Sequence, residues 1–367
     1  MRLVWGIVTK VVVDEEQVQH LEVALDDRST GRAVAFPPLS GRCVLSDRVL
    51  LNTTAVDLAL GTGGLHFVVT RGPAEGVVLD QPAGGHIMKL RYTPMQLDVA
   101  SVEEQGAPDH ETMKSAESLG SLPVACCGLH SQVPLVAAAI KNADPNLKVV
   151  YVMSDQAALP LALSDVVRTG KQVGLLDATV TCGQSFGGDI EAVNLHSGLL
   201  AACHVLKADV VIVAIGPGVV GTATPFGHGG VAQGEAINAV SVLGGVPVAV
   251  LRVSFADARS RHHGVSHHTI SALTRIALAR ALVALPSLPE EYEDVIEEAL
   301  DLAGVWALHR RISTSAGRTS PPSTRGIEVR TMGRSIAEDP AFFAAAFAAG
   351  EVCVRAAHGE HFEPEAG

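Results

Sequence analysis

The chain has 367 residues, of which 47% are hydrophobic, and a formal net charge of -12 at pH 7. This length and composition fit two or three domains with a large buried core and exclude a disordered protein. The negative charge argues against nucleic-acid binding and against docking on an anionic membrane, because both need clustered basic residues.

The start of the chain predicts a first strand rather than a signal peptide. Residues 1–17 (MRLVWGIVTKVVVDEEQ) contain an apolar patch, but acidic residues follow at once and there is no small-residue cleavage site. No run reaches the roughly 18 apolar residues of a membrane helix. The six cysteines show no CxxC spacing and are expected to be reduced. We therefore expect a cytoplasmic protein.

Residues 1–97 are expected to form an all-β domain, either a small barrel or a sandwich. Short apolar runs alternate there with turn-forming sequences, at residues 3–13, 18–25, 33–36, 48–52, 66–70 and 86–92. The glycine cluster at residues 61–64 is more typical of a tight turn than of an anion-binding loop.

The composition changes at residues 98–120, which are rich in charged residues. They lack a sustained apolar period, which predicts a linker or a surface helix. A domain boundary is expected in this stretch.

Residues 121–312 are expected to form a Rossmann-like parallel sheet with flanking helices. Five continuous apolar runs are each followed by a loop and a helix-length segment, at residues 122–127, 147–153, 173–180, 209–215 and 246–253. Continuous apolar runs are typical of strands buried on both faces. Ligands of such sheets bind at the carboxyl ends of the strands. The loops that follow the five strands therefore form the expected site.

The C-terminal part of the chain is expected to add helices to this domain. The sequence predicts a helix at about residues 266–285 and an acidic helix at about residues 290–302. Residues 313–367 are expected to contain a loop at 315–326, a strand near 327–330 and a helix at about 339–349. This terminal element could cover a sheet edge or a partner subunit, so a homodimer is a possible assembly.

The loop after the fifth strand, residues 252–269 (RVSFADARSRHHGVSHHT), carries most of the titratable side chains of the expected site. Ser266 is a predicted helix N-cap, so the next two histidines lie in the first helical turn, where the dipole disfavours imidazolium. Histidine acid–base chemistry is expected from His263 and His267 with Asp257, and ligand contacts from Arg252, Arg259, Arg261 and His268.

The glycine-rich loop at residues 216–230 is the second expected ligand-binding segment. Gly216, Gly218 and Gly221 fit a GxGxxG spacing, which alone is a weak dinucleotide signal. Glycines let backbone amides approach a phosphate or carboxylate closely. Thr222 and His228 are the polar side chains expected to join these amides.

A third candidate is Ser185, which lies in the sequence GQSFG at residues 183–187. This sequence matches the GxSxG nucleophile elbow, and Asp257 and the histidines follow it in the order of an α/β-hydrolase triad. The alternative interpretation is a serine in an ordinary glycine turn. Asp189, just after this turn, is predicted to cap a helix that begins near residue 190.

The phrases LNTTA (51–55), GTGG (61–64), FGGD (186–189), GPGVVGT (216–222) and RHHGVSHH (261–268) together resemble an uncharacterised bacterial family of actinobacteria and firmicutes. The resemblance covers nearly the whole chain. The family is a domain of unknown function, so the resemblance implies no activity, cofactor or catalytic residue.

Three functions remain open on the sequence. The first is a hydrolase or transferase that uses histidine acid–base chemistry on a small anionic or phosphorylated metabolite. The second is a regulator or scaffold that binds such a metabolite without turning it over. The third is a metalloenzyme that uses the histidine cluster with Asp257 or Asp189. The sequence specifies no cofactor and no metal.

Overall fold

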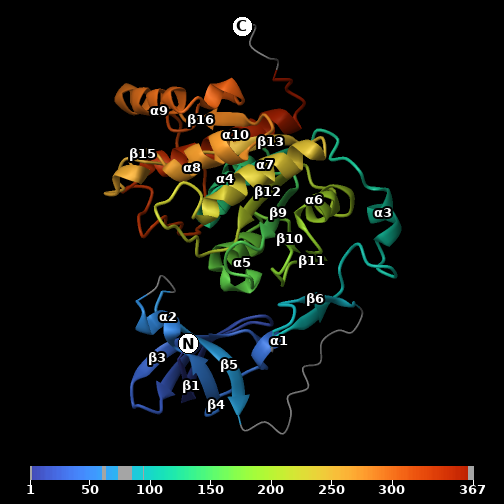
Figure 1. Ribbon diagram of the computed structural model, residues 1–367, viewed down its shortest axis with the longest axis vertical. Coiled ribbons are helices and arrows are strands. Elements are labelled where there is room, and N and C mark those ends of the chain that lie inside the picture. Colours follow the sequence, from blue (N-terminus) through green and yellow to red (C-terminus); the bar gives the residue numbers. More distant parts are fainter. Residues whose placement is uncertain (1, 60–62, 73–84, 94, 363–367) are drawn as a thin grey trace. The chain divides into compact units, whose positions relative to one another are not determined.

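The computed structural model describes residues 2–59, 63–72, 85–93 and 95–362. The chain divides into two compact units, Met1–Ala100 and Ser101–Gly367. The first is a closed barrel and the second a parallel sheet with flanking helices, as Figure 1 shows for each unit by itself. This confirms the predicted fold class, an all-β barrel or sandwich followed by a Rossmann-like sheet.

The first unit is a five-stranded barrel in the order β1-β2-β3-β5-β4. It closes because β4 pairs with both β1 and β5. Alternate side chains of the strands point inward, and Val8, Leu21 and Leu51 are almost fully buried. Of the glycine cluster at 61–64, residues 61 and 62 lie outside the described residues. The elements of this unit are β1 (Leu3–Asp14), β2 (Gln19–Leu25), β3 (Thr30–Ala35), α1 (Pro37–Ser40), β4 (Arg48–Asn52), α2 (Thr54–Asp57), β5 (Leu65–Gly72), β6 (Ile87–Lys89) and β7 (Leu97–Val99).

The second unit contains an eight-stranded sheet in the order β11-β10-β9-β12-β8-β13-β16-β17. Every neighbouring pair in it is parallel. All five predicted strands are present, although β10 begins five residues later than the apolar run that predicted it. The strands are β8 (Pro123–Cys127), β9 (Val149–Ser154), β10 (Ala178–Cys182), β11 (Ile190–Ala192), β12 (Val210–Ile215), β13 (Val246–Val250), β16 (Leu282–Leu285) and β17 (Arg310–Ser313).

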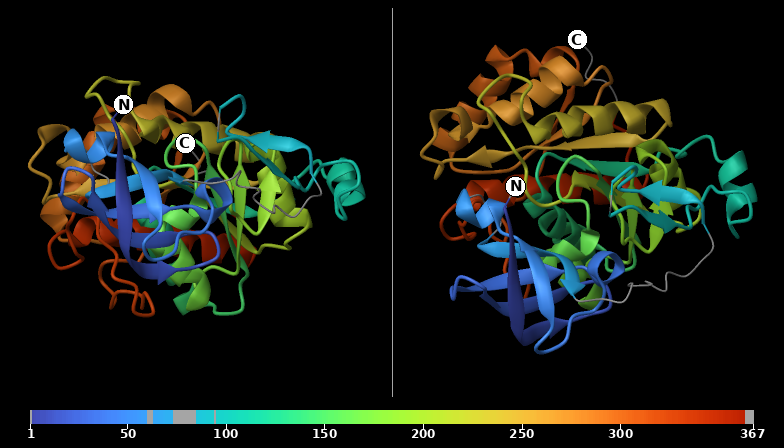
Figure 2. Two further views of the ribbon diagram at one scale, coloured as in Figure 1. Left: turned by 90° about the horizontal axis from the view of Figure 1, so that it is seen from below. Right: turned by 60° about the horizontal axis from the view of Figure 1, so that its bottom comes forward.

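Helices cover both faces of this sheet. One face packs against α4 (Val133–Ala143), α5 (Asp165–Gln172) and α10 (Pro340–Ala357). The other packs against α6 (Leu195–His204), α7 (Ala232–Val242) and α9 (Glu290–Leu302), as the views of Figure 2 show for α7 and α10. The strands are buried on both sides, which explains their continuous apolar sequences.

Helix α10 is the one helix of the described residues that is long and apolar enough to cross a membrane. Length and composition alone give this result. Of its residues, 72% are buried inside the unit, where Phe342, Phe343 and Phe347 join the core. These contacts are those of a core helix.

The structure corrects several sequence predictions in the second unit. The helix expected at residues 266–285 is short: α8 (His267–Ser271) continues into a π-helical segment, Ala272–Ile276, and the chain then enters β16. The segment after Asp189 is strand β11, not a helix. No strand forms at residues 327–330, and the terminal helix continues to Ala357.

Candidate functional site

The loop after β13 folds back as a small hairpin, and this places the histidines beside it. The hairpin pairs β14 (Val253–Ser254) with β15 (Gly264–Val265) in antiparallel fashion. Ser266 then caps α8, and its Oγ accepts a hydrogen bond from the backbone N–H of His268 at 3.2 Å. The predicted N-cap is confirmed, and His267 and His268 lie in the first turn of α8.

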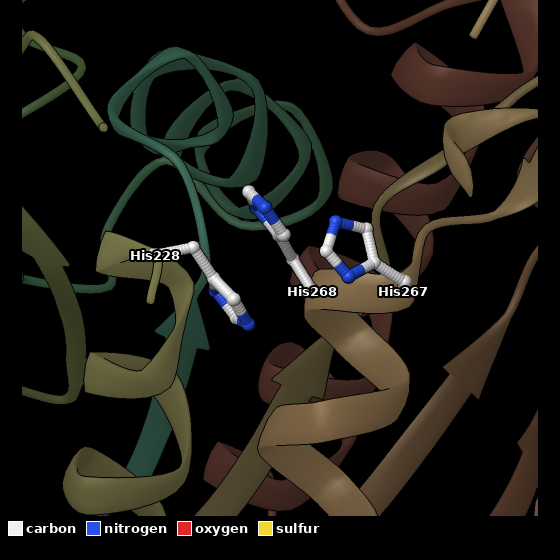
Figure 3. A group of neighbouring side chains, drawn as sticks. All are labelled: His228, His267 and His268. Atoms are coloured by element: carbon white, nitrogen blue, oxygen red, sulfur yellow. The ribbon is translucent and has the colours of Figure 1, made fainter. Parts of the chain in front are cut away.

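Three histidines from two segments of the chain gather here, as Figure 3 shows. His267 and His268 come from α8, and His228 comes from the segment just before α7. One ligand nitrogen of each ring lies within 4.8 Å of the others. The rings of His228 and His268 stack in parallel, with centroids 3.9 Å apart. His262 is a fourth member, with its centroid 4.9 Å from that of His268.

Burial and neighbouring positive charge keep these rings neutral. Burial, His228 and Arg252 lower the pKa of His268 to about 2. Burial and Arg252 also lower the pKa of His262, to about 3. The pKa values of His228 and His267 are lowered too, mainly by burial. At neutral pH each ring therefore offers one N–H donor and one lone pair.

Arg252 lies beneath the histidines as a buried cation. Its side chain is 7% exposed, and its nearest carboxylate oxygen, on Asp257, is 3.9 Å away. Its Nη1 donates a hydrogen bond to Nδ1 of His268 at 3.2 Å. Burial, followed by repulsion from Arg259, lowers the pKa of Arg252 to about 10. The guanidinium remains charged at neutral pH, and its ion pair with Asp257 is long at 3.9 Å.

Asp257 holds the neighbouring arginines in place, and its charge also acts on the pKa of His262. Its carboxylate accepts hydrogen bonds from Nε, Nη2 and the backbone N–H of Arg259, at 2.9, 2.6 and 3.1 Å. Arg334 lies 3.5 Å away on the other side and also pairs with Asp339. The hydrogen bonds from Arg259 hold the pKa of Asp257 well below its ordinary range. A carboxylate so engaged has little capacity to accept another proton.

Two ring nitrogens of the cluster face glycines. Because Arg252 can only donate, Nδ1 of His268 is the acceptor and Nε2 carries the proton. A Cβ on Gly221 would lie 3.4 Å from this Nε2. Nε2 of His228 donates to the Pro225 carbonyl at 3.2 Å, which leaves a lone pair on Nδ1. That Nδ1 is buried without a partner, and a Cβ on Gly230 would lie 3.0 Å from it.

Other predicted site residues lie away from this cluster. His263 is exposed and packs edge-on against Phe255 at 5.6 Å. Arg261 is exposed as well, although its charge acts on the pKa values of Arg252 and His267. Asp189 accepts from Thr179 and pairs with Lys171, so the structure does not bring it to the histidines.

The structure does not bring Ser185 to Asp257 or to the histidines. Its Oγ donates to the Ser154 carbonyl at 3.1 Å, and the side chain is fully buried. Ser185 follows β10, which lies four positions from β13 in the sheet, about 19 Å at about 4.8 Å per strand. The expected triad is not assembled in the described residues.

Only one end of the glycine-rich loop at residues 216–230 reaches the histidine cluster. Gly221 pairs with His228 at an isolated bridge and so reaches the cluster. A Cβ on Gly216 would lie 2.2 Å from the Ala158 carbonyl oxygen, so this glycine is needed for packing. Gly218 has a φ of +92° and lines a separate cavity. The exposed Thr222 hydroxyl donates to the Gly227 carbonyl within the loop.

Sequence reasoning left two members of the site without a role, His262 and Arg334. His262 was inside the expected loop, and its Nδ1 lies 2.7 Å from Oγ of Ser266, a contact that the i, i+4 spacing does not reveal outside a helix. Arg334 belongs to a C-terminal segment without regular structure, and the sequence contains no signal that connects it to Asp257.

Residues 32–350 match the family model described as "Protein of unknown function (DUF3866)". The matched range includes every residue of the histidine and arginine cluster. No curated protein and no solved structure matches the chain.

Proposed function

The chain belongs to the DUF3866 family of proteins of unknown function, and we propose that it binds a small anionic or phosphorylated metabolite at the carboxyl edge of its parallel sheet. We propose further that it acts on this metabolite as a hydrolase or transferase with histidine acid–base chemistry. The observation that most directly supports this proposal is the excess of positive charge around Arg252.

The charges around Arg252 do not balance. Three other guanidinium groups act on its pKa, those of Arg259, Arg334 and Arg261. The carboxylates in contact with these arginines are those of Asp257 and Asp339. Four positive charges face two carboxylates in contact and a third, that of Glu338, which Arg334 also acts on, so at least one positive charge is in excess. A buried cation whose carboxylate partner is 3.9 Å away and is shared with two other arginines is incompletely compensated, so an anionic ligand would bind there favourably.

The ring tautomers assign roles within the proposed site. Arg252 and the Nε2–H group of His268 are donors for the anion, because a charge-assisted hydrogen bond is worth about 1.5–3 kcal/mol. His228 has its lone pair at Nδ1, where no protein group occupies it. This nitrogen is the proposed general base, and His267 stands beside it with an unpartnered buried Nε2.

Inorganic phosphate is a suitable first probe. We expect it to shift the ring resonances of His228 and His268 in nuclear magnetic resonance spectra. Arg252→Gln should weaken phosphate binding about 10-fold or more, the equivalent of about 1.4 kcal/mol. The matched control is Arg280→Gln, at the opposite edge of the sheet, where the side chain donates to the Leu308 carbonyl. Equal affinities for both variants and the wild type would refute the proposed anion site.

A measurement of substrate turnover distinguishes an enzyme from a protein that only binds its ligand. His228→Ala should abolish hydrolysis of small phosphoesters while phosphate affinity changes less than threefold, because the base does not hold the anion in this proposal. Tight phosphate binding without turnover of phosphoesters, esters or amides would favour a regulator or scaffold instead.

A metalloenzyme is the second candidate function. The three-histidine spacing and the buried, unpartnered nitrogens of His228 and His267 favour it, since zinc sites commonly use three imidazoles. Arg252 argues against it, because a metal-bound His268 would need a proton acceptor at Nδ1 and meets a donor. Elemental analysis of protein purified without an affinity tag decides between the two. About one zinc per chain would replace the anion proposal with the metal one.

The compartment and partners belong to the same proposal. A cytoplasmic location is supported by six free cysteines, five of them buried. The net charge of -12 supports neither a nucleic-acid nor a membrane partner. A homodimer is kept as a proposed assembly, and light scattering coupled to size-exclusion chromatography tests it.

A further inference from the structure

A second cavity of about 320 Å³ lies in the α/β unit, at the loops that follow β8 and β12. Its walls are mostly apolar, and its polar groups include one serine in hydrogen-bond contact with one histidine. The lining includes His130 and Ser164 and the apolar side chains of Leu129, Leu163, Val166 and Val219. The histidine and arginine cluster is not part of this lining.

The serine and the histidine form a short, oriented contact. Oγ of Ser164 lies 2.6 Å from Nε2 of His130. On the other side of the ring, Nδ1 lies 3.2 Å from the carbonyl oxygen of Ile215 and 3.2 Å from the hydroxyl oxygen of Tyr151, whose own proton is donated to that carbonyl. A carbonyl can only accept, so Nδ1 carries the proton and Nε2 the lone pair. The Ser164 hydroxyl therefore donates to His130, whose ring the backbone holds in the basic tautomer.

We propose that Ser164 is a nucleophile activated by His130 for a small, largely apolar ester. Oγ attacks the carbonyl carbon and forms a new C–O bond, while its proton passes to Nε2 of His130. The bond to the leaving alkoxide then breaks, and His130 returns the proton to that oxygen. Water repeats the two steps, releases the acid and restores the serine. No oxidant or cofactor is needed, and this proposal goes beyond the anion site at His228 and His268.

The contact fits the requirements for an activated serine. A nucleophile and its base should lie about 2.6–3.2 Å apart, with a third group that orients the base. Tyr151 packs beside the ring, with centroids 5.9 Å apart, and its hydroxyl also donates to the Ile215 carbonyl. Burial lowers the pKa of His130 to about 4, so the ring is an unprotonated base at neutral pH.

Ser164 also has a structural role, as the N-cap of α5. Its Oγ accepts from the backbone N–H of Val167 at 3.2 Å. Ser266 provides an internal comparison, because it caps α8 and contacts His262 at 2.7 Å. Ser266 does not line this cavity, whereas Ser164 does, and the cavity is large enough for a small ester. Reaction at Ser164 but not at Ser266 would show that Ser164 is a nucleophile as well as a helix cap.

The test uses an alkyl fluorophosphonate on the full chain, with the adduct located by peptide mass spectrometry. The reaction forms a P–O bond to a serine and releases fluoride, and we expect one adduct, at Ser164. Ser164→Asn keeps a side-chain acceptor for the cap and should prevent labelling. His130→Phe keeps a ring of similar size and should slow labelling at least 100-fold, the lower limit for a general base.

The pH profile gives a readout that a helix cap would not change. Because His130 is already unprotonated above about pH 5, the labelling rate should stay level between pH 6 and 8. A rate that rises 10-fold per pH unit would indicate unassisted alkoxide formation and overturn the proposal. So would no adduct, an adduct at another serine, or full labelling of His130→Phe. Arg280→Gln, outside both sites, should label like the wild type. The labelling test does not depend on Arg252 or on phosphate binding, so failure of the anion site would leave its result unaffected.

Discussion

In each of the stacked rings of His228 and His268, one nitrogen has a hydrogen-bond partner among the described residues and the other has none. Arg252 fixes the tautomer of His268, and the Pro225 carbonyl fixes that of His228. Glycines at positions 221 and 230 keep methyl groups away from the two free nitrogens. Each ring thus keeps one committed nitrogen and one available nitrogen, which is the arrangement that binding and proton transfer require.

Asp257→Asn tests how much the hydrogen bonds and ion pairs of Asp257 with the neighbouring arginines stabilise the fold. The carboxylate is 3% exposed, and it receives three hydrogen bonds from Arg259. We expect its loss to lower the free energy of unfolding at pH 7 by about 2–3 kcal/mol, less than for a fully buried pair because Arg259 is partly exposed. Urea denaturation of both proteins measures this difference.

The pH dependence of that difference has a definite sign. The pKa of Asp257 is lowered below its ordinary value of 3.8 in the folded chain. The stabilisation should therefore be equal at pH 7 and about pH 5, shrink as the pH falls below 3.8, and vanish below the folded pKa. The exposed Asp294 provides the control, since Asp294→Asn should change stability by less than about 0.5 kcal/mol. A gap that widens toward pH 3 would contradict this account.

At the scale of elements, the burial of the strands explains why the sequence predicts most strands of the sheet correctly and misses others. The five predicted strands have continuous apolar runs bounded by turn residues, and all five form. The sequence did not predict strand β16, because residues 272–285 are rich in Ala, Leu and Arg, which fit a helix at least as well as a strand. Its strand conformation comes from pairing with β13 and β17, contacts that a single segment cannot reveal.

The same limit applies to the candidate site. The order of strands and loops placed His228, Arg252, His267 and His268 at one edge, and the structure brings these four together. It could not assign Ser185 or His263, because a short motif does not give the distance across a sheet or the direction of a loop side chain. The contact of His130 with Ser164 joins residues 34 positions apart and leaves no pattern in the sequence.

Helix packing provides the prediction at this scale. Gly350 of α10 faces α4, where a Cβ would lie 2.5 Å from Cβ of Ala139 and 2.8 Å from the Val136 carbonyl oxygen. Alanine gains about 1 kcal/mol in helix propensity over glycine, but overpacking of a rigid helix pair costs about 1–3 kcal/mol. We therefore expect Gly350→Ala to lower the melting temperature.

Gly170 of α5 is the matched control. A Cβ there would meet only Leu176 and Ile327, at 3.4 Å or more. Gly170→Ala should thus be neutral or stabilise the protein by up to about 1 kcal/mol. Differential scanning calorimetry of both variants checks the opposite signs. A stabilised Gly350→Ala protein would mean that α4 and α10 are not packed as closely as described.

On the scale of the whole molecule, the residues of the hydrophobic cores show where each of the two units begins and ends. The barrel core is built from strands β1 to β5, and both cores of the α/β unit lie after residue 100. Residues 101–120 are part of the second unit: Ser101 bridges to Glu191, and Val102, Met113 and Leu119 are buried against the sheet. The α/β unit therefore begins before the first strand of the sheet.

Two truncations test this boundary. Residues 101–367 should fold alone, unfold cooperatively in urea and bind phosphate with an affinity within about twofold of the full chain, because they contain both cores and the whole cluster. Residues 121–367 lack three buried apolar side chains, each worth about 1.5–3 kcal/mol. This shorter chain should lose several kcal/mol of stability, although it keeps every strand of the sheet. If both truncated chains were equally stable, residues 101–120 would be a linker; if neither folded, the α/β unit would depend on the barrel.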